Sequence, residues 1–195
     1  MNDTKNYRTC PDIRPRAWSG GLLCNAVRRC AVAMVFGVFF AFPAGAQQQS
    51  AASAVAMLSV KVAAMEKTLS EAGEGLVIYV ANAPDVAREL RKLVGQHVGK
   101  SRIAVIQEGT SLPTSRPDIV FIGSPELAPK FVKYARLNRT LSVCNRADVA
   151  EYGVTLFLGT DETAGKPTIV LNATGSREEA MEWNPALFRI AKTTR

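Results

Sequence analysis

The sequence is poor in residues that commonly carry covalent or metal chemistry. Among its 195 residues it has one histidine, His97, and four cysteines, of which only Cys144 lies beyond residue 46. His97 stands between two turn glycines without a cysteine nearby, so a histidine-based nucleophile or a metal site would lack its usual partners. We therefore expect His97 to be a solvated loop residue, and we expect neither a metal site nor catalytic activity.

The sequence also lacks the Walker loop and the glycine-rich dinucleotide fingerprint. Acidic pairs occur at Asp161-Glu162 and Glu178-Glu179, where a polar turn and a helix start explain them. One candidate for a small ligand remains, the turn of Gly175, Ser176 and Arg177. It joins the end of a strand to the start of a helix, where backbone N–H groups can hold an anion and Arg177 adds positive charge. The competing interpretation is an ordinary capped turn, and no cofactor is expected.

The first 46 residues have the pattern of a secretory signal peptide. A region with six basic residues leads into an almost wholly apolar run at residues 31–42, and Ala44-Gly45-Ala46 supplies small residues for signal peptidase. The apolar run has about a dozen residues, whereas a helix that spans a bilayer needs roughly 20. We therefore predict cleavage before Gln47, export to the periplasm, and no stable membrane anchor after cleavage.

Removal of residues 1–46 changes the charge of the chain. That segment holds six of the 24 basic and two of the 17 acidic residues, which leaves 18 against 15, or a net charge of +3. The basic excess is thus mostly a property of the signal peptide, and no nucleic-acid partner is expected. Residues 47–195 fit one domain of common size. Their single cysteine cannot form an intramolecular disulfide, and the apolar run around Cys144 favours a buried thiol over an intermolecular link.

The order of apolar runs predicts an α/β fold. Short β-branched runs, typical of strands covered on both faces, alternate with segments of helical spacing. This order implies a three-layer fold, with a mostly parallel sheet of about six strands and helices on both faces. Only a turn of about six residues separates the last two strands, so one antiparallel strand is expected near the C-terminus. The expected strands are residues 76–80, 103–106, 118–122, 141–144, 154–160 and 168–171, and the main helices are residues 52–69, 82–94, 128–135 and 145–152.

The C-terminal part of the chain is expected to end in two short helices. The last strand stops at Asn172, and Ser176 with Glu179 three residues later matches a capping box for the next helix. Asn184-Pro185 then starts a second helix, because proline suits the first helical position. Trp183 is expected to pack between the two helices rather than to be exposed. The apolar face of the last helix is expected to consist of Leu187, Phe188 and Ala191.

This C-terminal part resembles the YfiR-like family of bacterial periplasmic regulators. The likeness lies in the strand Thr168 to Asn172, which ends in an asparagine, followed by a helix with a small polar middle and then by the segment PALFRIAK. In that pattern Asn172, Leu187 and Arg189 stand at family-motif positions. Further matches, in the same order and spacing, are residues 78–85, residues 118–124, Glu126, residues 140–143 and Gly153.

The resemblance implies a function. A YfiR-like protein binds the periplasmic sensor region of an inner-membrane diguanylate cyclase and restrains it, and so acts in cyclic di-GMP signalling. Ile78 and Pro117 stand where many family members have cysteines, so the family's disulfide and the redox control that depends on it are not expected. The residues alone leave open a periplasmic small-molecule sensor or binding protein that uses the turn at Gly175 to Arg177. They also leave open the oligomeric state, including a homodimer.

Overall fold

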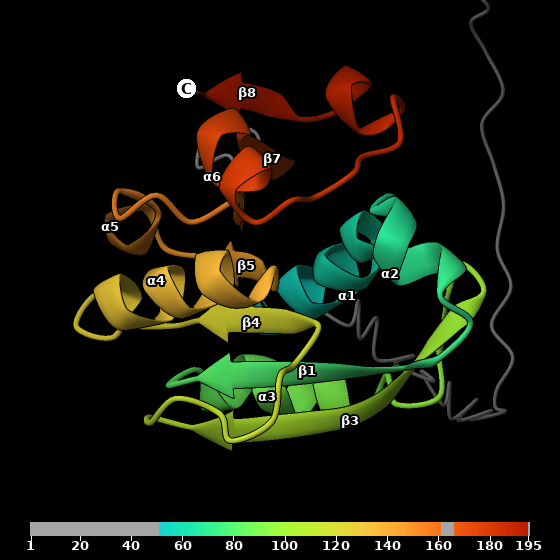
Figure 1. The fold of residues 1–195 in the computed structure, drawn as a ribbon, viewed down its shortest axis with the longest axis horizontal. Coiled ribbons are helices and arrows are strands. Elements are labelled where there is room, and N and C mark those ends of the chain that lie inside the picture. The colour runs from blue at the N-terminus through green and yellow to red at the C-terminus, as the bar shows by residue number, and fades with distance from the viewer. Residues whose placement is uncertain (1–50, 161–165, 195) are drawn as a thin grey trace, which may run out of the picture. The chain divides into compact units, whose positions relative to one another are not determined.

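The computed structural model describes residues 51–160 and 166–194. Within this part the chain forms one sheet with the strand order β2-β3-β1-β4-β5-β6-β7-β8, and helices lie on both of its faces (Figure 1). The predicted signal peptide and most of the predicted turn after residue 160 lie outside the described residues. No helix in the described part is long and apolar enough to cross a bilayer.

Strands and helices alternate along most of the chain. The strands are β1 (Gly75–Ala81), β2 (His97–Val98), β3 (Ser101–Gly109), β4 (Ile119–Ile122), β5 (Leu141–Cys144), β6 (Leu156–Thr160), β7 (Pro167–Asn172) and β8 (Lys192–Thr194). The helices are α1 (Ala51–Ala63), α2 (Lys67–Glu71), α3 (Pro84–Arg91), α4 (Ala128–Asn138), α5 (Ala147–Ala150), α6 (Ala173–Glu178) and the 3-10 helix η1 (Leu187–Arg189). This order is that of an α/β fold.

The predicted fold class is confirmed. Neighbouring strands are parallel from β3 through β1, β4 and β5 to β6, and β6 and β7 form the expected antiparallel pair. The sheet has eight strands instead of about six, because β2 pairs antiparallel with β3 and β8 pairs parallel with β7 at the two edges. These edge strands have two and three residues, and only Val98 among them is buried. Neither therefore carries an apolar pattern that a sequence could reveal.

The core consists of two apolar clusters, one on each face of the sheet. Successive side chains of a strand point to opposite faces. Ile78 and Phe121 accordingly belong to the cluster that contains residues of α1 and α3, while Tyr79 and Val120 belong to the cluster that contains residues of α4 and α5. The Tyr79 ring stacks on Phe131 of α4, with 5.8 Å between ring centroids. The central strands are thus buried on both faces, which explains their continuous apolar sequences.

The prediction of one helix over residues 52–69 is wrong, because the chain breaks between α1 and α2. At the break Glu66 has extended backbone angles, with φ −86° and ψ 123°, and forms an isolated bridge with Trp183. The Glu66 side chain is fully buried and accepts hydrogen bonds from the N–H of Leu69 at 2.7 Å and of Glu182 at 2.8 Å. Helical spacing cannot reveal the break, since it depends on a partner 116 positions further along the chain.

The predicted capping box of Ser176 and Glu179 is also wrong. α6 begins directly after Asn172, whose Oδ1 accepts hydrogen bonds from two backbone N–H groups of the first turn, both at 3.0 Å. Glu179 is fully buried at the other end of α6 and accepts a hydrogen bond from the N–H of Ser142 at 3.0 Å. An N-terminal asparagine therefore does the capping, and the glutamate connects α6 to β5.

The predicted last α-helix is replaced by η1 and β8. Leu187 is fully buried as expected, but Phe188 is 53% exposed. The chain after η1 becomes extended because Lys192–Thr194 pairs with β7, and this pairing replaces the helical hydrogen bonds. Trp183 is buried, as predicted, and its Nε1 donates to Ser176 Oγ at 2.7 Å.

Candidate functional site

The strand order places a crevice at the carboxyl ends of the parallel strands. β3, which follows β1 in the chain after α3 and β2, pairs with one side of β1. β4, the next strand in the chain, pairs with the other side of β1. In open α/β sheets, ligands bind outside the carboxyl ends of the strands at such a reversal of strand order. Two cavities that share Asn82, Ala83 and Pro84 lie at this position. Together they are called the carboxyl-edge crevice below.

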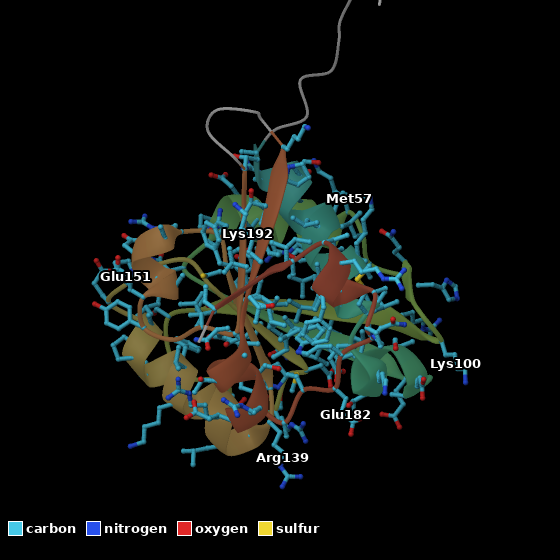
Figure 2. All side chains as sticks on the ribbon, turned by 90° about the horizontal axis from the view of Figure 1, so that it is seen from above. Met57, Lys100, Arg139, Glu151, Glu182 and Lys192 are labelled. Carbon is cyan, nitrogen blue, oxygen red and sulfur yellow. The ribbon has the colours of Figure 1, made fainter. Side chains whose placement is uncertain are left out.

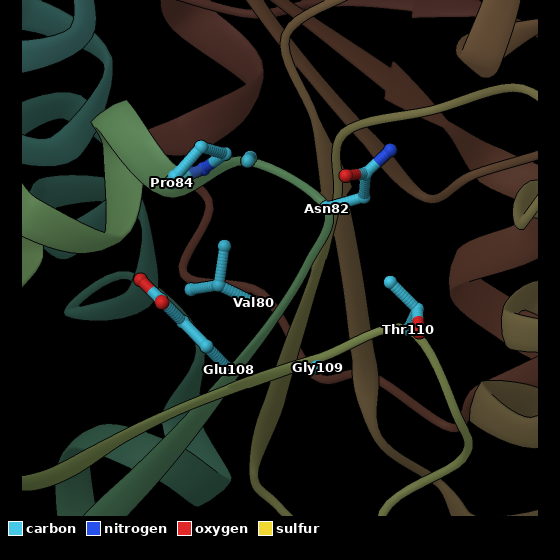
Figure 3. A pocket seen from close by; sticks show the side chains of 7 residues that line it. Val80, Asn82, Pro84, Glu108, Gly109 and Thr110 are labelled. Carbon is cyan, nitrogen blue, oxygen red and sulfur yellow. The ribbon is translucent and has the colours of Figure 1, made fainter.

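The first cavity, of about 240 Å³, lies between the ends of β1 and β3 (Figure 3). Val80 and Asn82 approach it from β1 and its loop, and Glu108 and Thr110 approach it from the end of β3. The Glu108 carboxylate forms an ion pair with Arg91 at 3.1 Å. This cavity therefore offers a ligand mainly amide and hydroxyl groups.

The second cavity, of about 290 Å³, lies between the loop after β1 and the loops after β4 and β5. Asn82 has a left-handed backbone with φ 55°, and a Cβ on Gly123 would lie 2.4 Å from the Asn82 carbonyl oxygen. Only glycine lets these two loops approach so closely. Asn145 and Arg146 complete the lining, and Arg146 pairs with Asp148 through two contacts of 3.0 and 2.6 Å.

The chemistry of the carboxyl-edge crevice is that of binding. The amides of Asn82 and Asn145 can each donate and accept hydrogen bonds. α3 starts at Pro84 with Ala83 as its N-cap, so no side chain caps its first turn. The charged side chains around the crevice are already paired with one another. Neutral, polar small molecules match this lining better than strongly charged ones.

No family model matches the chain. No curated protein matches it either. Among solved structures, the chain is similar to a conserved domain protein from Vibrio cholerae O1 biovar eltor, with a TM-score of 0.49 and 15% sequence identity over 75% of this chain and 60% of that one. The chain thus spans less than two thirds of that protein's length.

The predicted ligand turn lies inside α6, and its groups are engaged locally. The N–H of Gly175 donates to Asn172 Oδ1, and a Cβ at Gly175 would lie 2.9 Å from the Gly153 carbonyl oxygen. Ser176 is buried, and its Oγ accepts a hydrogen bond from the indole N–H of Trp183. Arg177 Nε donates to the carbonyl of the residue four positions before it, at 3.3 Å. This geometry is that of the ordinary capped turn, the competing interpretation.

The three family-motif positions all lie in the described part of the chain, and their surroundings differ. Asn172 caps α6, and Leu187 is fully buried in the core. Arg189 is exposed at the end of η1. Two of the three positions thus support the packing of the C-terminal segment, and one faces solvent.

His97 and Cys144, the histidine and the cysteine of the described residues, differ in their exposure. His97 is exposed, as predicted, although it lies in the edge strand β2 and not in a loop. Cys144 is buried, as predicted, and burial raises the pKa of its thiol to about 12. Such a thiol is inert because the thiolate is the nucleophile. The described residues contain no group of three acidic, histidine or cysteine side chains that could hold a metal ion.

An apolar surface that the sequence did not predict lies in the C-terminal segment, at Phe188 and Ile190. Phe188 and Ile190 are 53% and 55% exposed, and they directly precede the fully exposed edge strand β8. Phe188, Ile190 and Lys192–Thr194 are called the C-terminal edge below. No alternation of apolar and polar residues marks it in the sequence, because Phe188 follows Leu187 and Ile190 precedes Ala191.

Proposed function

We propose that the chain is a periplasmic regulatory protein that binds and restrains the periplasmic sensor region of an inner-membrane signalling protein, a diguanylate cyclase. The observation that carries this proposal is the C-terminal edge. It lies in the part of the chain that resembles the YfiR-like regulators, and it combines two large exposed apolar side chains with a strand edge. The resemblance supplies the class of partner, and the surface supplies a means of binding it.

The C-terminal edge suits a protein partner for two reasons. β8 is the last strand in the order of the sheet, so one side of its backbone presents N–H and C=O groups that another strand can pair with. An extended segment that adds to such an edge gains main-chain hydrogen bonds, and pockets or apolar contacts beside the edge provide specificity. Phe188 and Ile190 offer those apolar contacts.

Restraint of a partner requires a difference in affinity. The regulator must bind the inactive state of the cyclase more tightly than the active state. A shift of the partner from mostly active to almost fully inactive needs a preference on the order of 10⁴-fold. A surface that adds a strand and buries two large apolar side chains can provide such a preference if the pairing strand is available only in the inactive state.

The test is the level of cyclic di-GMP in cells of the native host. Deletion of the gene is expected to raise it, and expression of the unchanged chain is expected to restore it. The double variant Phe188→Ser/Ile190→Ser should accumulate normally and fail to restore it. The matched control is Val94→Ser/Val105→Ser, which removes apolar side chains of similar exposure, 48% and 45%, away from the C-terminal edge. An unchanged cyclic di-GMP level after deletion would refute the proposal.

A second candidate function is that of a small-molecule sensor or binding protein, favoured by the position of the carboxyl-edge crevice at the reversal of strand order. A ligand that binds only the folded chain would raise its melting temperature by mass action. The experiment is a thermal-unfolding screen of neutral polar metabolites. Any increase should disappear in Asn145→Ala, and a screen without an increase would argue against this function.

A further inference from the structure

A larger and more enclosed cavity lies at the opposite edge of the sheet from the carboxyl-edge crevice. It has a volume of about 430 Å³ and lies where β1 and β4 begin, beside α2 and the segment after α6. It is called the amino-edge pocket below. Its apolar lining includes Leu69, Leu76 and Met181, of which the two leucines are buried in the core. Pockets that hold organic ligands have volumes of about 300 to 1,000 Å³, so this one is large enough for a compact molecule.

Two arginines line the amino-edge pocket and form no ion pair within the described part of the chain. Arg116 lies just before β4, and Arg139 is the left-handed C-cap of α4, with φ 51°. Arg116 Nη2 donates to the Arg139 carbonyl oxygen at 2.9 Å, which holds the two residues together. Neither guanidinium forms an ion pair with a carboxylate of the described residues. Most of their donors are thus available to a ligand.

Four acidic residues line the same pocket, in two different situations. Glu66 accepts hydrogen bonds from two backbone N–H groups, and Asp118 Oδ2 accepts one from the N–H of Val77 at 2.8 Å. The carboxylates of Glu74 and Glu182 make no hydrogen bond or ion pair with a described side chain, and both residues are exposed. Figure 2 shows Glu182 on the same side of the molecule as Arg139. The pocket therefore presents two carboxylates and two guanidinium groups that have no ion-pair partner among residues 51–160 and 166–194.

We propose that the amino-edge pocket binds a short peptide with free ends. Arg116 and Arg139 would hold its carboxylate, and Glu74 and Glu182 would hold its ammonium group. Apolar side chains of the peptide would lie on the leucine and methionine lining. Charge-assisted hydrogen bonds are roughly twice as strong as neutral ones, and guanidinium groups can bind a carboxylate through two parallel bonds.

Separation of the charges in the pocket favours a peptide over smaller ions. The arginines form no ion pair with Glu74 or Glu182, so a ligand that carries both signs of charge can use both sets of side chains. An anion alone would leave the carboxylates unpaired, and a cation alone would leave the arginines unpaired. Peptide binding in this pocket does not require the partner binding proposed for the C-terminal edge.

The test is isothermal titration calorimetry on protein purified after expression of the full-length chain. The probes are the dipeptide Leu-Leu, its N-acetyl form, its C-terminal amide, and free leucine. Leu-Leu is expected to bind, and each blocked form is expected to bind about tenfold more weakly or worse, since each block removes one charge-assisted contact. Free leucine, which is shorter, should also bind more weakly than Leu-Leu.

Variants identify the pocket. Arg116→Gln/Arg139→Gln should weaken Leu-Leu by about tenfold or more and leave the weak binding of the C-terminal amide unchanged. Arg88→Gln is the matched control, because Arg88 pairs with Asp85 on α3 and does not line the pocket. The proposal is overturned if Leu-Leu shows no binding at about 10 mM. It is also overturned if either blocked form or free leucine binds as tightly as Leu-Leu, or if the double variant binds Leu-Leu normally.

Discussion

Glu179 should make the stability of the fold depend on pH near neutrality. Its carboxyl group is fully buried between α6 and the sheet, where Ser142 donates to it through both the backbone N–H and the side-chain hydroxyl. Burial raises the pKa of Glu179 from 4.5 to about 7, and the hydrogen bonds from Ser142 and the positive charge of Arg136 oppose this increase only in part. Thr155 and the Arg136–Glu178 ion pair complete its surroundings.

The sign of the effect follows from the proton balance. In the unfolded chain Glu179 releases its proton near pH 4.5, but in the folded chain it keeps the proton until about pH 7. The folded state binds more protons in this window, so the free energy of unfolding falls as pH rises. The contribution is fully present below pH 4.5 and is lost as pH rises through about 7. At about 1.4 kcal/mol per pH unit, the loss over the window is about 3 kcal/mol.

The assay is urea unfolding of the unchanged chain and of Glu179→Gln at about pH 5 and about pH 8. The unchanged chain should lose between about 2 and 3 kcal/mol more than the variant across this range. Glu178→Gln is the control, because Glu178 is a neighbouring residue whose side chain is 44% exposed and should contribute less than about 1 kcal/mol. The same pH dependence in the unchanged chain and in Glu179→Gln would refute the reasoning.

Three further perturbations test the packing around the C-terminal segment. Asn172→Ala removes the cap of α6 and should cost about 0.5 to 2 kcal/mol in urea unfolding, whereas Asn172→Asp should cost less because a carboxylate can still accept both bonds. Glu66→Ala leaves the buried N–H of Leu69 unpaired, at about 1 to 3 kcal/mol, and removes the acceptor of the partly buried N–H of Glu182, so its melting temperature should fall well below that of the surface variant Glu71→Ala. Cys144 should react with iodoacetamide only after unfolding, and rapid labelling of the folded chain would contradict its burial.

The central strands could be predicted because they are buried on both faces. β4 and β5 read as short, mostly apolar runs, and such runs reflect burial directly. The antiparallel step from β6 to β7 followed from the length of the turn alone. These features depend on residues close together in the sequence, so local patterns were sufficient.

The roles of the two buried glutamates could not be predicted, because they depend on distant partners. Glu179 has the spacing of a capping box with Ser176, but it binds Ser142, 37 positions earlier in the chain. Glu66 lies in a segment of helical spacing, but its partner Glu182 belongs to the C-terminal segment. Local rules gave the wrong result where a buried carboxyl group forms its hydrogen bonds with residues far away in the sequence.

The candidate sites also depend on residues that are far apart in the sequence. The turn around Gly175 was singled out for its residue types, and the structure uses its donors locally. The amino-edge pocket combines α2, the residues before β4, the end of α4 and the segment after α6, and no short stretch of sequence contains this combination. The C-terminal edge could not be predicted, because Leu187, Phe188 and Ala191 have the spacing of one face of a helix, and the pairing of β8 with β7 depends on residues about 20 positions earlier.

The most direct test of the proposed regulatory role is a crosslinking capture from solubilised inner membranes of the native host, with the captured proteins identified by mass spectrometry. We expect enrichment of one membrane protein that has a periplasmic region and a cytoplasmic cyclase domain. The enrichment should be lost with Phe188→Ser/Ile190→Ser and kept with Val94→Ser/Val105→Ser. Capture of no membrane protein above the level of a matched control, or capture that is indifferent to the C-terminal edge, would contradict the account.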